Sequence, residues 1–274
     1  MREMTLKDIQ QVSLEILKDI HQFCVENDIK YSLFSGTLIG AIRHQGFIPW
    51  DDDLDIAFTR PEYEKFVRTY KSKHDFKLFA RERQGDDVYI SYARVCDMNR
   101  TFVDDSHFPW AKEKKGVWVD IFPLDGAEED TKKAMKQCEE NYKIWLVGAR
   151  IRNSKSPFSK AYGISNKIKL LIKKLLYSWR SNSYWDKHVT YCKRIDFNSS
   201  KNYLHLAWGG WKMREYYKTS AFDNYKLVPF EDGEFYVMQG YDGALRAKYG
   251  DYMQLPPVEE RVAPHGNAKY YWID

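Results

Sequence analysis

The segment DDDLDIAF at residues 51–58 constrains the fold of this chain most, because acidic and apolar side chains alternate along it from Asp53 onward. This alternation predicts a strand over residues 53–58 with one polar and one apolar face. Asp53 and Asp55 then point to the same side, roughly 6.6 Å apart along the strand, while their apolar neighbours face the core. Two carboxylates on one face repel each other unless a cation lies between them, and a site built only from oxygen ligands suits Mg²⁺ or Mn²⁺.

A third acid, Asp120, lies in the otherwise apolar segment VWVDIF at residues 117–122. An unpaired carboxylate in such a strand costs several kcal/mol, so a lone acid there indicates a site rather than a packing position. If this strand neighbours the acidic one, Asp120 completes a three-carboxylate site. Such a site can hold two metal ions, or one metal ion and a general base.

The tripeptide Ser35-Gly36-Thr37 comes between a short strand predicted at residues 31–34 and a short helix predicted at residues 38–43. Glycine allows close backbone approach, hydroxyl groups donate hydrogen bonds, and a helix N-terminus favours phosphate. Together with the acidic strand that follows, this arrangement predicts a site for a phosphate group and a metal ion. Phosphoryl transfer needs little else from a protein.

Several basic residues are weaker candidates for phosphate contacts. They are Arg43, His44, Arg94, Arg261 and His265. The first two end the short helix. Arg94 lies on a strand predicted over residues 88–96, where a contact with the donor phosphate and an ordinary salt bridge remain equal alternatives. The last two belong to a proline-rich tail that can close over the site, although single basic residues in loops are usually solvated.

The remaining patterns predict an α+β fold, a mixed sheet with flanking helices. A capping box at Thr5 and Asp8 opens an amphipathic helix that ends near Asn27. Pro123 is expected to end the strand before it. Further helices are predicted at residues 61–70, 131–152 and 165–180. We expect residues 1–126 to form a catalytic core and residues 127–274 a mainly helical, aromatic-rich lobe that completes the donor and acceptor sites, with one compact domain as the alternative.

Composition excludes several classes of protein. The 43 Lys and Arg against 39 Asp and Glu give a net charge of +4, which is too small and too evenly spread for a nucleic-acid binder. No apolar run approaches the roughly 18 residues needed to span a bilayer, and the polar N-terminus resembles neither a secretory signal nor a transit peptide. Four dispersed cysteines without a CxxC pair predict reduced thiols. These features favour a soluble cytoplasmic enzyme.

Three motifs resemble the LicD family of phosphorylcholine transferases, whose signature also occurs in fukutin-related proteins. They are SGTLIGAIRHQGFIPWDDDLDIAF at residues 35–58, GVWVDIFPLDG at residues 116–126 and KYGDYMQLPP at residues 248–257. The first motif is long and specific, and together they span most of the chain, with the middle helical part less distinctive. The resemblance implies a nucleotidyltransferase fold.

By this resemblance, Ser35-Gly36 occupies the family's Gly-Ser-type loop, although the order here is Ser then Gly. Asp53 and Asp55 match the family's metal-binding pair and Asp120 its third carboxylate, with Mg²⁺ or Mn²⁺ as the cofactor. The implied reaction transfers phosphocholine from CDP-choline to a sugar hydroxyl of a teichoic acid or lipopolysaccharide precursor and releases CMP. Related members move other groups such as ribitol phosphate, so the donor stays open.

The aromatic content, with 20 Tyr, 15 Phe and 9 Trp, is sufficient for a cage around a choline cation. The candidates are Trp110, Trp118, Trp208 and Trp211. Each of them alone is more often a packing residue.

The predicted helix at residues 165–180 combines an apolar stripe with lysines on its other faces. Such a helix can lie on an anionic membrane, which suits a lipid-linked acceptor at the inner face of the cell membrane. The alternative is a helix packed on the sheet with solvated lysines.

Three other interpretations are weaker. An EF-hand loop would use Asp51, Asp53, Asp55 and Glu62, but its sixth position needs glycine and holds Ile56. A glycosyltransferase with an Asp-x-Asp motif usually begins with a nucleotide-binding βαβ unit, whereas here the acids follow a Ser-Gly loop directly. A non-catalytic choline or glycan binder is often repetitive, and this chain has no repeat.

Overall fold

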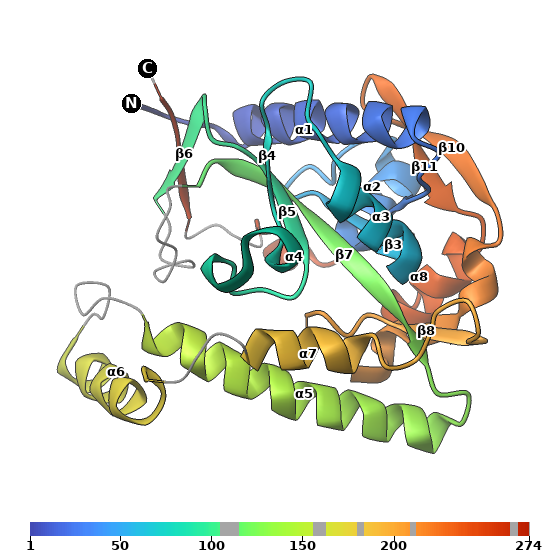
Figure 1. Cartoon of the computed structure of the whole chain (residues 1–274). Helices are drawn as coiled ribbons and strands as arrows, with labels where there is room; N and C mark the ends of the chain where they lie inside the picture. Colours follow the sequence, from blue (N-terminus) through green and yellow to red (C-terminus); the bar gives the residue numbers. More distant parts are fainter. Residues whose placement is uncertain (105–114, 156–162, 180–183, 209–211, 264–267, 274) are drawn as a thin grey trace.

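The computed structural model describes residues 1–104, 115–155, 163–179, 184–208, 212–263 and 268–273 (Figure 1). The helices and 3-10 turns are α1 (Leu6–Glu26), α2 (Ser35–His44), α3 (Arg60–Thr69), α4 (Arg81–Gln84), η1 (Gly85–Asp87), α5 (Thr131–Ser154), α6 (Gly163–Tyr177), α7 (Tyr184–Cys192), η3 (Lys212–Glu215), η4 (Thr219–Phe222), α8 (Tyr241–Tyr249) and η5 (Val258–Glu260). The strands are β1 (Arg2–Glu3), β2 (Ser32–Leu33), β3 (Asp55–Thr59), β4 (Lys77–Phe79), β5 (Ala93–Asp97), β6 (Thr101–Asp104), β7 (Val117–Ala127), β8 (Asn202–Leu204), β9 (Tyr217–Lys218), β10 (Tyr225–Phe230), β11 (Gly233–Met238) and β12 (Lys269–Trp272).

The central sheet places the two acidic segments on neighbouring strands. Its order is β2-β3-β7-β5-β4, and β8 and β9 extend it beyond the end of β7. β3 and β7 run parallel, whereas the other pairs in this sheet are antiparallel. A second sheet, β1-β12-β6, brings the two ends of the chain together, and β10 and β11 form a hairpin (Figure 1). This mixed sheet with its helices confirms the predicted α+β class.

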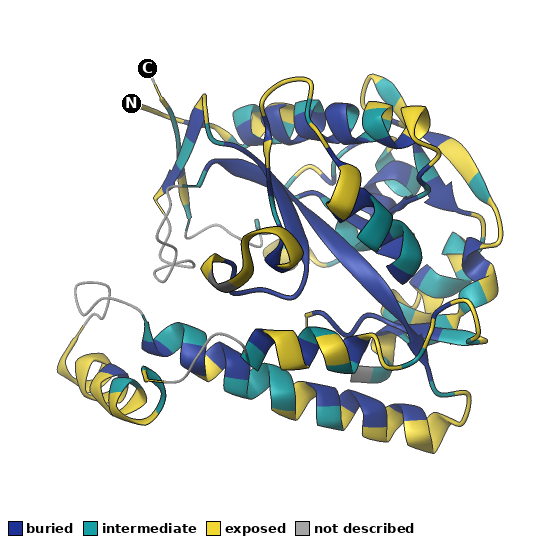
Figure 2. Cartoon of the chain, viewed as in Figure 1, coloured by how far each residue is buried: buried dark blue, intermediate teal, exposed yellow. Residues whose placement is uncertain are grey.

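The two faces of β3 and β7 differ in what they carry. Ile56 and Phe58 are fully buried on the face covered by α1 and α3, where the ring of Phe58 lies 5.0 Å from that of Phe66. Figure 2 shows β7 buried along its whole length between the layers. Because side chains alternate along a strand, Asp55 and Asp120 point to the opposite face. The buried apolar side chains therefore fix the orientation of the two strands, and with it the face on which Asp55 and Asp120 lie.

Several elements lie where their sequence patterns predict them. Thr5 and Asp8 form the capping box of α1, and Asn27 caps its end. The helices predicted at residues 61–70, 131–152 and 165–180 appear as α3, α5 and α6 with ends shifted by a few residues. Periodicity over these long segments was therefore a sufficient guide.

Two strand predictions were wrong at their starts. β3 begins at Asp55 rather than at Asp53, because the backbone before it is held by other contacts: the amide of Asp51 donates to Ile48 O at 2.9 Å. The strand predicted over residues 88–96 begins only at Ala93, since the carbonyl of Val88 accepts a hydrogen bond from the Arg81 guanidinium at 3.0 Å instead of joining a ladder.

The expectation that Pro123 ends its strand was also wrong, because β7 continues to Ala127. β5 pairs with β7 as far as Ile121, and β8 takes over from Asp125. Pro123 lies in the gap between these two antiparallel partners, where its missing N–H breaks no ladder hydrogen bond.

The last part of the chain returns to the first. The amide of Met238, in the β10–β11 hairpin, donates to Ser32 Oγ at 3.0 Å, and β12 pairs with both β1 and β6. α8 follows the hairpin and carries Lys248 toward α2. The division at residue 126 remains a prediction about folding units, since residues from both parts meet at the site described next.

Candidate active site

Asp55 and Asp120 are direct neighbours on the central sheet. They are paired in the parallel register of β3 and β7, and the amide of Asp120 donates to Leu54 O at 2.9 Å. Paired residues on adjacent strands point to the same face, with backbones about 4.8 Å apart. The structure thus brings together two predicted site residues that are 65 positions apart in the sequence.

A second group of acids immediately precedes β3. Carboxylate oxygens of Asp51, Asp52 and Asp53 all lie within 4.8 Å of one another, and the first two residues are buried. The sequence predicted Asp53 as a metal ligand, but it brought in Asp51 only for the rejected EF-hand loop and did not single out Asp52. The run of three acids was the signal, but a strand over these residues would have pointed neighbouring side chains to opposite faces.

The electrostatics of Asp55 indicate a cation site. Burial raises the pKa of Asp55 well above its usual range, and the negative charges of Asp53, Asp120 and Asp51 raise it further, while Lys248 opposes the shift. A divalent cation relieves this repulsion, and a purely carboxylate set matches the oxygen preference of Mg²⁺ or Mn²⁺. The residues present therefore fit a hard divalent cation.

The N-terminus of α2 lies beside these acids. Ser35 begins the helix with a positive φ of 48°, so the tripeptide expected to form a loop is instead its first turn. A Cβ added to Gly36 would lie 2.7 Å from Asp51 Oδ2, which explains why glycine stands there. The hydroxyl of Thr37 accepts the amide hydrogen of Asp55 at 2.8 Å and so ties the helix to the start of β3.

Asp120 is held by neighbours on its own face of the sheet. Arg94, its partner across the β5–β7 ladder, donates from Nε to Asp120 Oδ1 at 2.5 Å and from Nη2 to Oδ2 at 3.3 Å. Trp118 Nε1 donates to Oδ2 at 3.1 Å. Of the two alternatives open for Arg94, the structure shows the salt bridge. Both oxygens of Asp120 therefore already accept hydrogen bonds.

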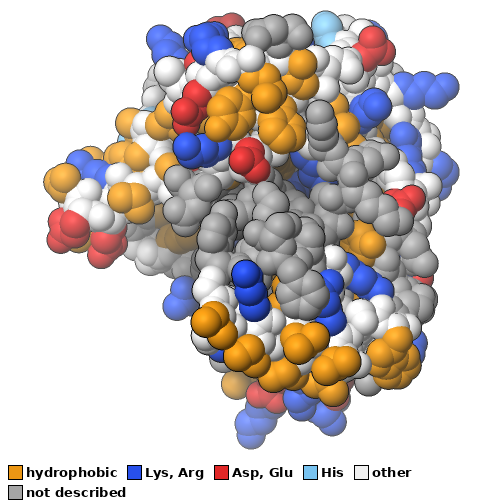
Figure 3. All heavy atoms as spheres, turned by 90° about the vertical axis from the view of Figure 1, so that its left-hand side faces the viewer, with side chains coloured by type: hydrophobic (Ala, Val, Ile, Leu, Met, Phe, Trp, Pro, Cys, Tyr) orange, Lys and Arg blue, Asp and Glu red, His pale blue; other side chains and the backbone are white. Residues whose placement is uncertain are grey.

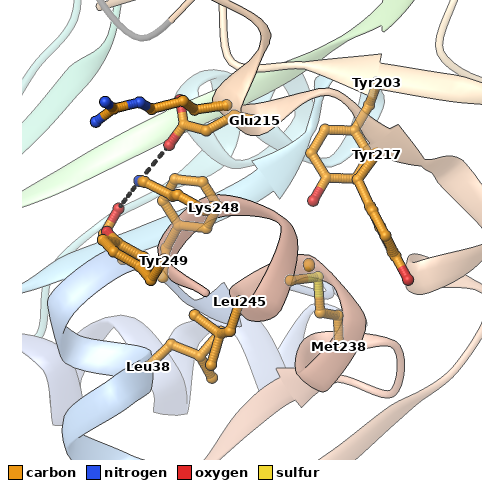
Figure 4. A pocket seen from close by; sticks show the side chains of 12 residues that line it. Leu38, Tyr203, Glu215, Tyr217, Met238, Leu245, Lys248 and Tyr249 are labelled. Atoms are coloured by element: carbon orange, nitrogen blue, oxygen red, sulfur yellow. Dashed lines mark hydrogen bonds and ion pairs between the residues drawn. The ribbon is translucent and has the colours of Figure 1, made fainter. Parts of the chain in front are cut away.

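A narrow pocket opens next to Ser35 (Figure 4). Lys248 donates to Ser35 Oγ at 2.9 Å and forms an ion pair with Glu215 inside this pocket. Sequence reasoning missed both Lys248 and Glu215. Lys248 opens the third quoted motif, KYGDYMQLPP, but nothing local connects it to a residue 213 positions earlier.

The aromatic candidates divide by exposure. Trp118 is buried, with the Arg94 guanidinium 4.8 Å from its ring and the ring of Tyr270 stacked at 5.9 Å, so its contacts are structural. Trp208 is 41% exposed and lies 5.8 Å, ring to ring, from Tyr92, which itself contacts Arg94. It is the better placed for a ligand of the two. Trp110 and Trp211 lie outside the described residues.

The basic candidates other than Arg94 have contacts with other parts of the chain. Arg43 and His44 lie in the last turn of α2, about 12 Å along the helix from Ser35. Arg43 instead donates to the carbonyl oxygen of Tyr252 at 2.6 Å and anchors the C-terminal segment. Arg261 packs 5.5 Å from the ring of Trp50. His265 lies outside the described residues.

Comparison with known proteins agrees with this geometry. A family model described as the LicD/FKTN/FKRP nucleotidyltransferase domain matches residues 28–143, which contain Asp51, Asp52, Asp53, Asp55 and Asp120. The chain is 33% identical over 282 residues to the lipopolysaccharide cholinephosphotransferase LicD of Haemophilus influenzae, covering 98% of this chain and 99% of that protein. An uncharacterized protein of Rickettsia typhi is 37% identical over 82 residues, or 30% of this chain and 26% of its own length. The chain therefore belongs to the LicD family and is a phosphotransferase with the nucleotidyltransferase fold.

Proposed function

We propose that this enzyme transfers phosphocholine from CDP-choline to a sugar hydroxyl of a cell-surface glycan precursor, of the teichoic acid or lipopolysaccharide type, and releases CMP. The similar Haemophilus influenzae protein is named a lipopolysaccharide cholinephosphotransferase, and the two chains match over nearly their whole lengths. The observation that carries the proposal is the parallel pairing of Asp55 with Asp120, because it gathers acids from distant segments beside the N-terminus of α2.

In this proposal Asp53, Asp55 and Asp120 hold Mg²⁺ or Mn²⁺, with Asp51 and Asp52 close enough to contribute. The bound ion supplies positive charge that offsets the charge on the donor pyrophosphate. Arg94 and Trp118 fix the orientation of the Asp120 carboxylate through their hydrogen bonds.

The first turn of α2 binds the donor phosphates. Its first helical hydrogen bond runs from the Leu38 amide to Phe34 O, so the amides of residues 35–37 precede the hydrogen-bonded part of the helix and can donate to phosphate oxygens. Lys248, already bonded to Ser35 Oγ, adds a cation at the same place. Holding the phosphorus in line with the attacking hydroxyl provides much of the rate acceleration.

Two alternative reactions differ in the donor. A CDP-alcohol such as CDP-ribitol carries the same pyrophosphate, and a sugar nucleotide would make the enzyme a glycosyltransferase. A non-catalytic choline or glycan binder disagrees with the family membership. Choline differs from these donors by its quaternary ammonium, for which an exposed aromatic such as Trp208 offers a cation–π contact.

The donor is tested by incubating the protein with Mg²⁺, an acceptor glycan and each of CDP-choline, CDP-ribitol and CDP-glycerol, and measuring CMP. We expect CMP only with CDP-choline, and only until EDTA is added. Asp232→Asn serves as the control variant, because Asp232 is exposed and pairs with Lys18 on the surface. Equal release from all three donors would contradict phosphocholine specificity, and no release from any would contradict the function itself.

We further propose that α6 places the enzyme on the membrane that carries its acceptor. Apolar side chains along this helix and just after it are between 48% and 79% exposed, namely those of Ile164, Ile168, Leu171, Ile172, Leu175, Leu176 and Trp179. Leu170 is buried and lies on the opposite side of α6 from these side chains, and α6 packs on α5. Figure 3 faces this side of the molecule and shows hydrophobic side chains along its lower part next to Lys and Arg side chains.

This surface of α6 is better suited to contact with lipid headgroups than to exposure to water. Monomeric proteins rarely expose so many large apolar side chains together. Lys167, Lys169, Lys173 and Lys174 add positive charge that anionic lipids attract. Within the described residues, no helix is long and apolar enough to span a membrane. A lipid-linked acceptor at the inner face of the cell membrane would then lie within reach of the site.

A further inference from the structure

A buried chain of charged and polar side chains adjoins the donor end of the site. His205 Nδ1 lies 2.9 Å from Glu215 Oε2, Glu215 forms an ion pair with Lys248, and Lys248 donates to Ser35 Oγ. The side chains of His205, Glu215 and Lys248 are 3%, 3% and 7% exposed. Buried ion pairs contribute little net stability, because desolvation cancels most of the attraction. Their presence beside a site points to a role in its chemistry.

The far nitrogen of His205 has the character of a proton acceptor. Among the described residues, Nε2 has no hydrogen-bond partner although it is buried. The Glu215 carboxylate on the other side of the ring favours the tautomer with hydrogen on Nδ1, which leaves a lone pair on Nε2. Burying a polar nitrogen without a partner costs free energy, so a ligand group is expected there.

His205 also lies on the correct face of the sheet. Its ring centroid is 4.6 Å from that of Phe122 and 5.6 Å from that of Phe34. Phe122 is two residues after Asp120 on β7 and therefore shares its face, and Phe34 immediately precedes Ser35. The imidazole thus packs on the face of β7 that carries Asp120 and against the residue that precedes the first turn of α2.

The acids of the site are poorly suited to take a proton from the acceptor. Both oxygens of Asp120 accept hydrogen bonds from Arg94 or Trp118. In the proposed function Asp53, Asp55 and Asp120 would hold the cation, whose positive charge would disfavour protonation of their carboxylates. His205 Nε2, which has no hydrogen-bond partner among the described residues, is therefore better suited than Asp120 to take the proton of the sugar hydroxyl.

We propose that His205 is the general base for the acceptor, a role that rests on the proposed function. As the sugar oxygen forms its bond to the donor phosphorus, its proton moves to His205 Nε2. The bond between that phosphorus and the oxygen bridging to CMP breaks, and CMP leaves with the electron pair. Glu215 stabilises the imidazolium through Nδ1 and is a positioning residue, and His205 later returns its proton to water.

The test compares His205→Gln with wild type in two separate measurements, steady-state transfer and CDP-choline binding by calorimetry. We expect kcat to fall by about 10²-fold or more, as is typical when a general base is removed, and donor Kd to change by less than about threefold. Glu215→Gln keeps the shape of its side chain and is expected to lower kcat about tenfold, also with little change in donor Kd. His74→Gln is the control, because His74 Nδ1 also pairs with a carboxylate, that of Asp19 at 2.8 Å, and Asp19 lies on α1, which covers the other face of the sheet.

The outcomes separate this inference from the function on which it rests. If wild type releases no CMP from any donor, the proposed function fails. If wild type is active and folded His205→Gln keeps wild-type kcat, or loses donor binding as strongly as turnover, His205 is not the base. Should His205→Gln fail to fold, Glu215→Gln decides, and an unchanged kcat in that variant overturns the inference.

Discussion

The carboxylate site and helix α6 break the usual distribution of side chains in opposite ways. The site buries charge, since Asp51, Asp52 and Asp120 are each less than 9% exposed. Helix α6 exposes apolar surface, with Leu175 at 70%. Buried charge and exposed apolar surface both lack the solvation they would ordinarily have. These two departures are the observations on which the proposed cation site and the proposed membrane contact rest.

The two regions also differ in how precisely they are built. In the site, Asp55 is fixed by the hydrogen bond of its amide to Thr37 and Asp120 by the hydrogen bond of its carboxylate to Arg94. On α6 the apolar side chains share only a helix face. Chemistry requires positions accurate to a fraction of an ångström, whereas membrane contact depends on area and net charge. Single substitutions should therefore have large effects in the site and small, additive ones on α6.

The largest effect is expected from Asp120→Asn and from Asp53→Asn. Each removes a charge from the cation site and should lower CMP release by about 10³-fold or more, while circular dichroism stays native. Asp232→Asn on the surface should keep full activity. More than a few per cent of residual activity in both site variants would show that the carboxylates are not essential.

Gly36→Ala is expected to have the next largest effect. The new Cβ would lie 2.7 Å from Asp51 Oδ2 and must displace that carboxylate. We expect a loss of activity of about 10²-fold with little change in thermal stability, because a displacement of about 1 Å can cost this much. Activity and Tm measured on the same preparation test this, and wild-type turnover would mean that the position of Asp51 is not critical.

Buried His188 on α7 supplies a prediction about pH. Burial, followed by the charge of Arg60, lowers the pKa of His188 to about 3. Between pH 6.5 and 3 the unfolded chain binds a proton that the folded chain does not, so the free energy of unfolding falls as pH falls through this window. Lowering the pH from 7 to 5 should cost about 2 kcal/mol from this group, and His188→Gln should remove that part of the dependence. Identical slopes for both proteins in urea unfolding would exclude it.

The smallest effect is expected on α6. Leu171→Glu and Leu175→Glu each remove apolar area and add a negative charge, so each should weaken binding to vesicles containing anionic lipid about tenfold. Turnover of a water-soluble acceptor should not change. Co-sedimentation with anionic and with neutral vesicles measures this, and Met135→Glu, at an exposed position on α5, is the control. Absence of binding by wild type would remove the membrane proposal and leave the site untouched.

Local patterns in the sequence predicted the acidic half of the site and the helices that support it. The alternation of acidic and apolar residues before Phe58 predicted one strand, and the single charged residue Asp120 in an apolar segment predicted the other. These two strands are neighbours in the sheet. Both signals are local, because a strand needs only one buried face to show its period. The start of β3 and the passage of β7 through Pro123 were missed, since both depend on contacts with other segments.

The positions of Lys248, Glu215 and His205 could not be predicted in the same way. Lys248 contacts Ser35 and Glu215, and Glu215 contacts His205, so these residues are joined by contacts between residues that are not neighbours in the sequence. Each of the three lies in a short or irregular segment. The hydrophobic periodicity of one segment does not predict which distant residues its side chains contact. The pairing of Arg94 with Asp120 was open for the same reason, because it follows from the antiparallel register of β5 and β7.

The most direct test of the shared cation site is the free energy of unfolding of wild type and Asp55→Asn, each with and without Mn²⁺, at neutral pH. Because the raised pKa of Asp55 reflects burial and repulsion, Asp55→Asn should be the more stable protein without metal. Saturating Mn²⁺ should then stabilise wild type by about 2 to 3 kcal/mol and Asp55→Asn hardly at all. Equal stabilisation of both proteins by Mn²⁺, or a less stable Asp55→Asn in its absence, would contradict a cation held between these carboxylates.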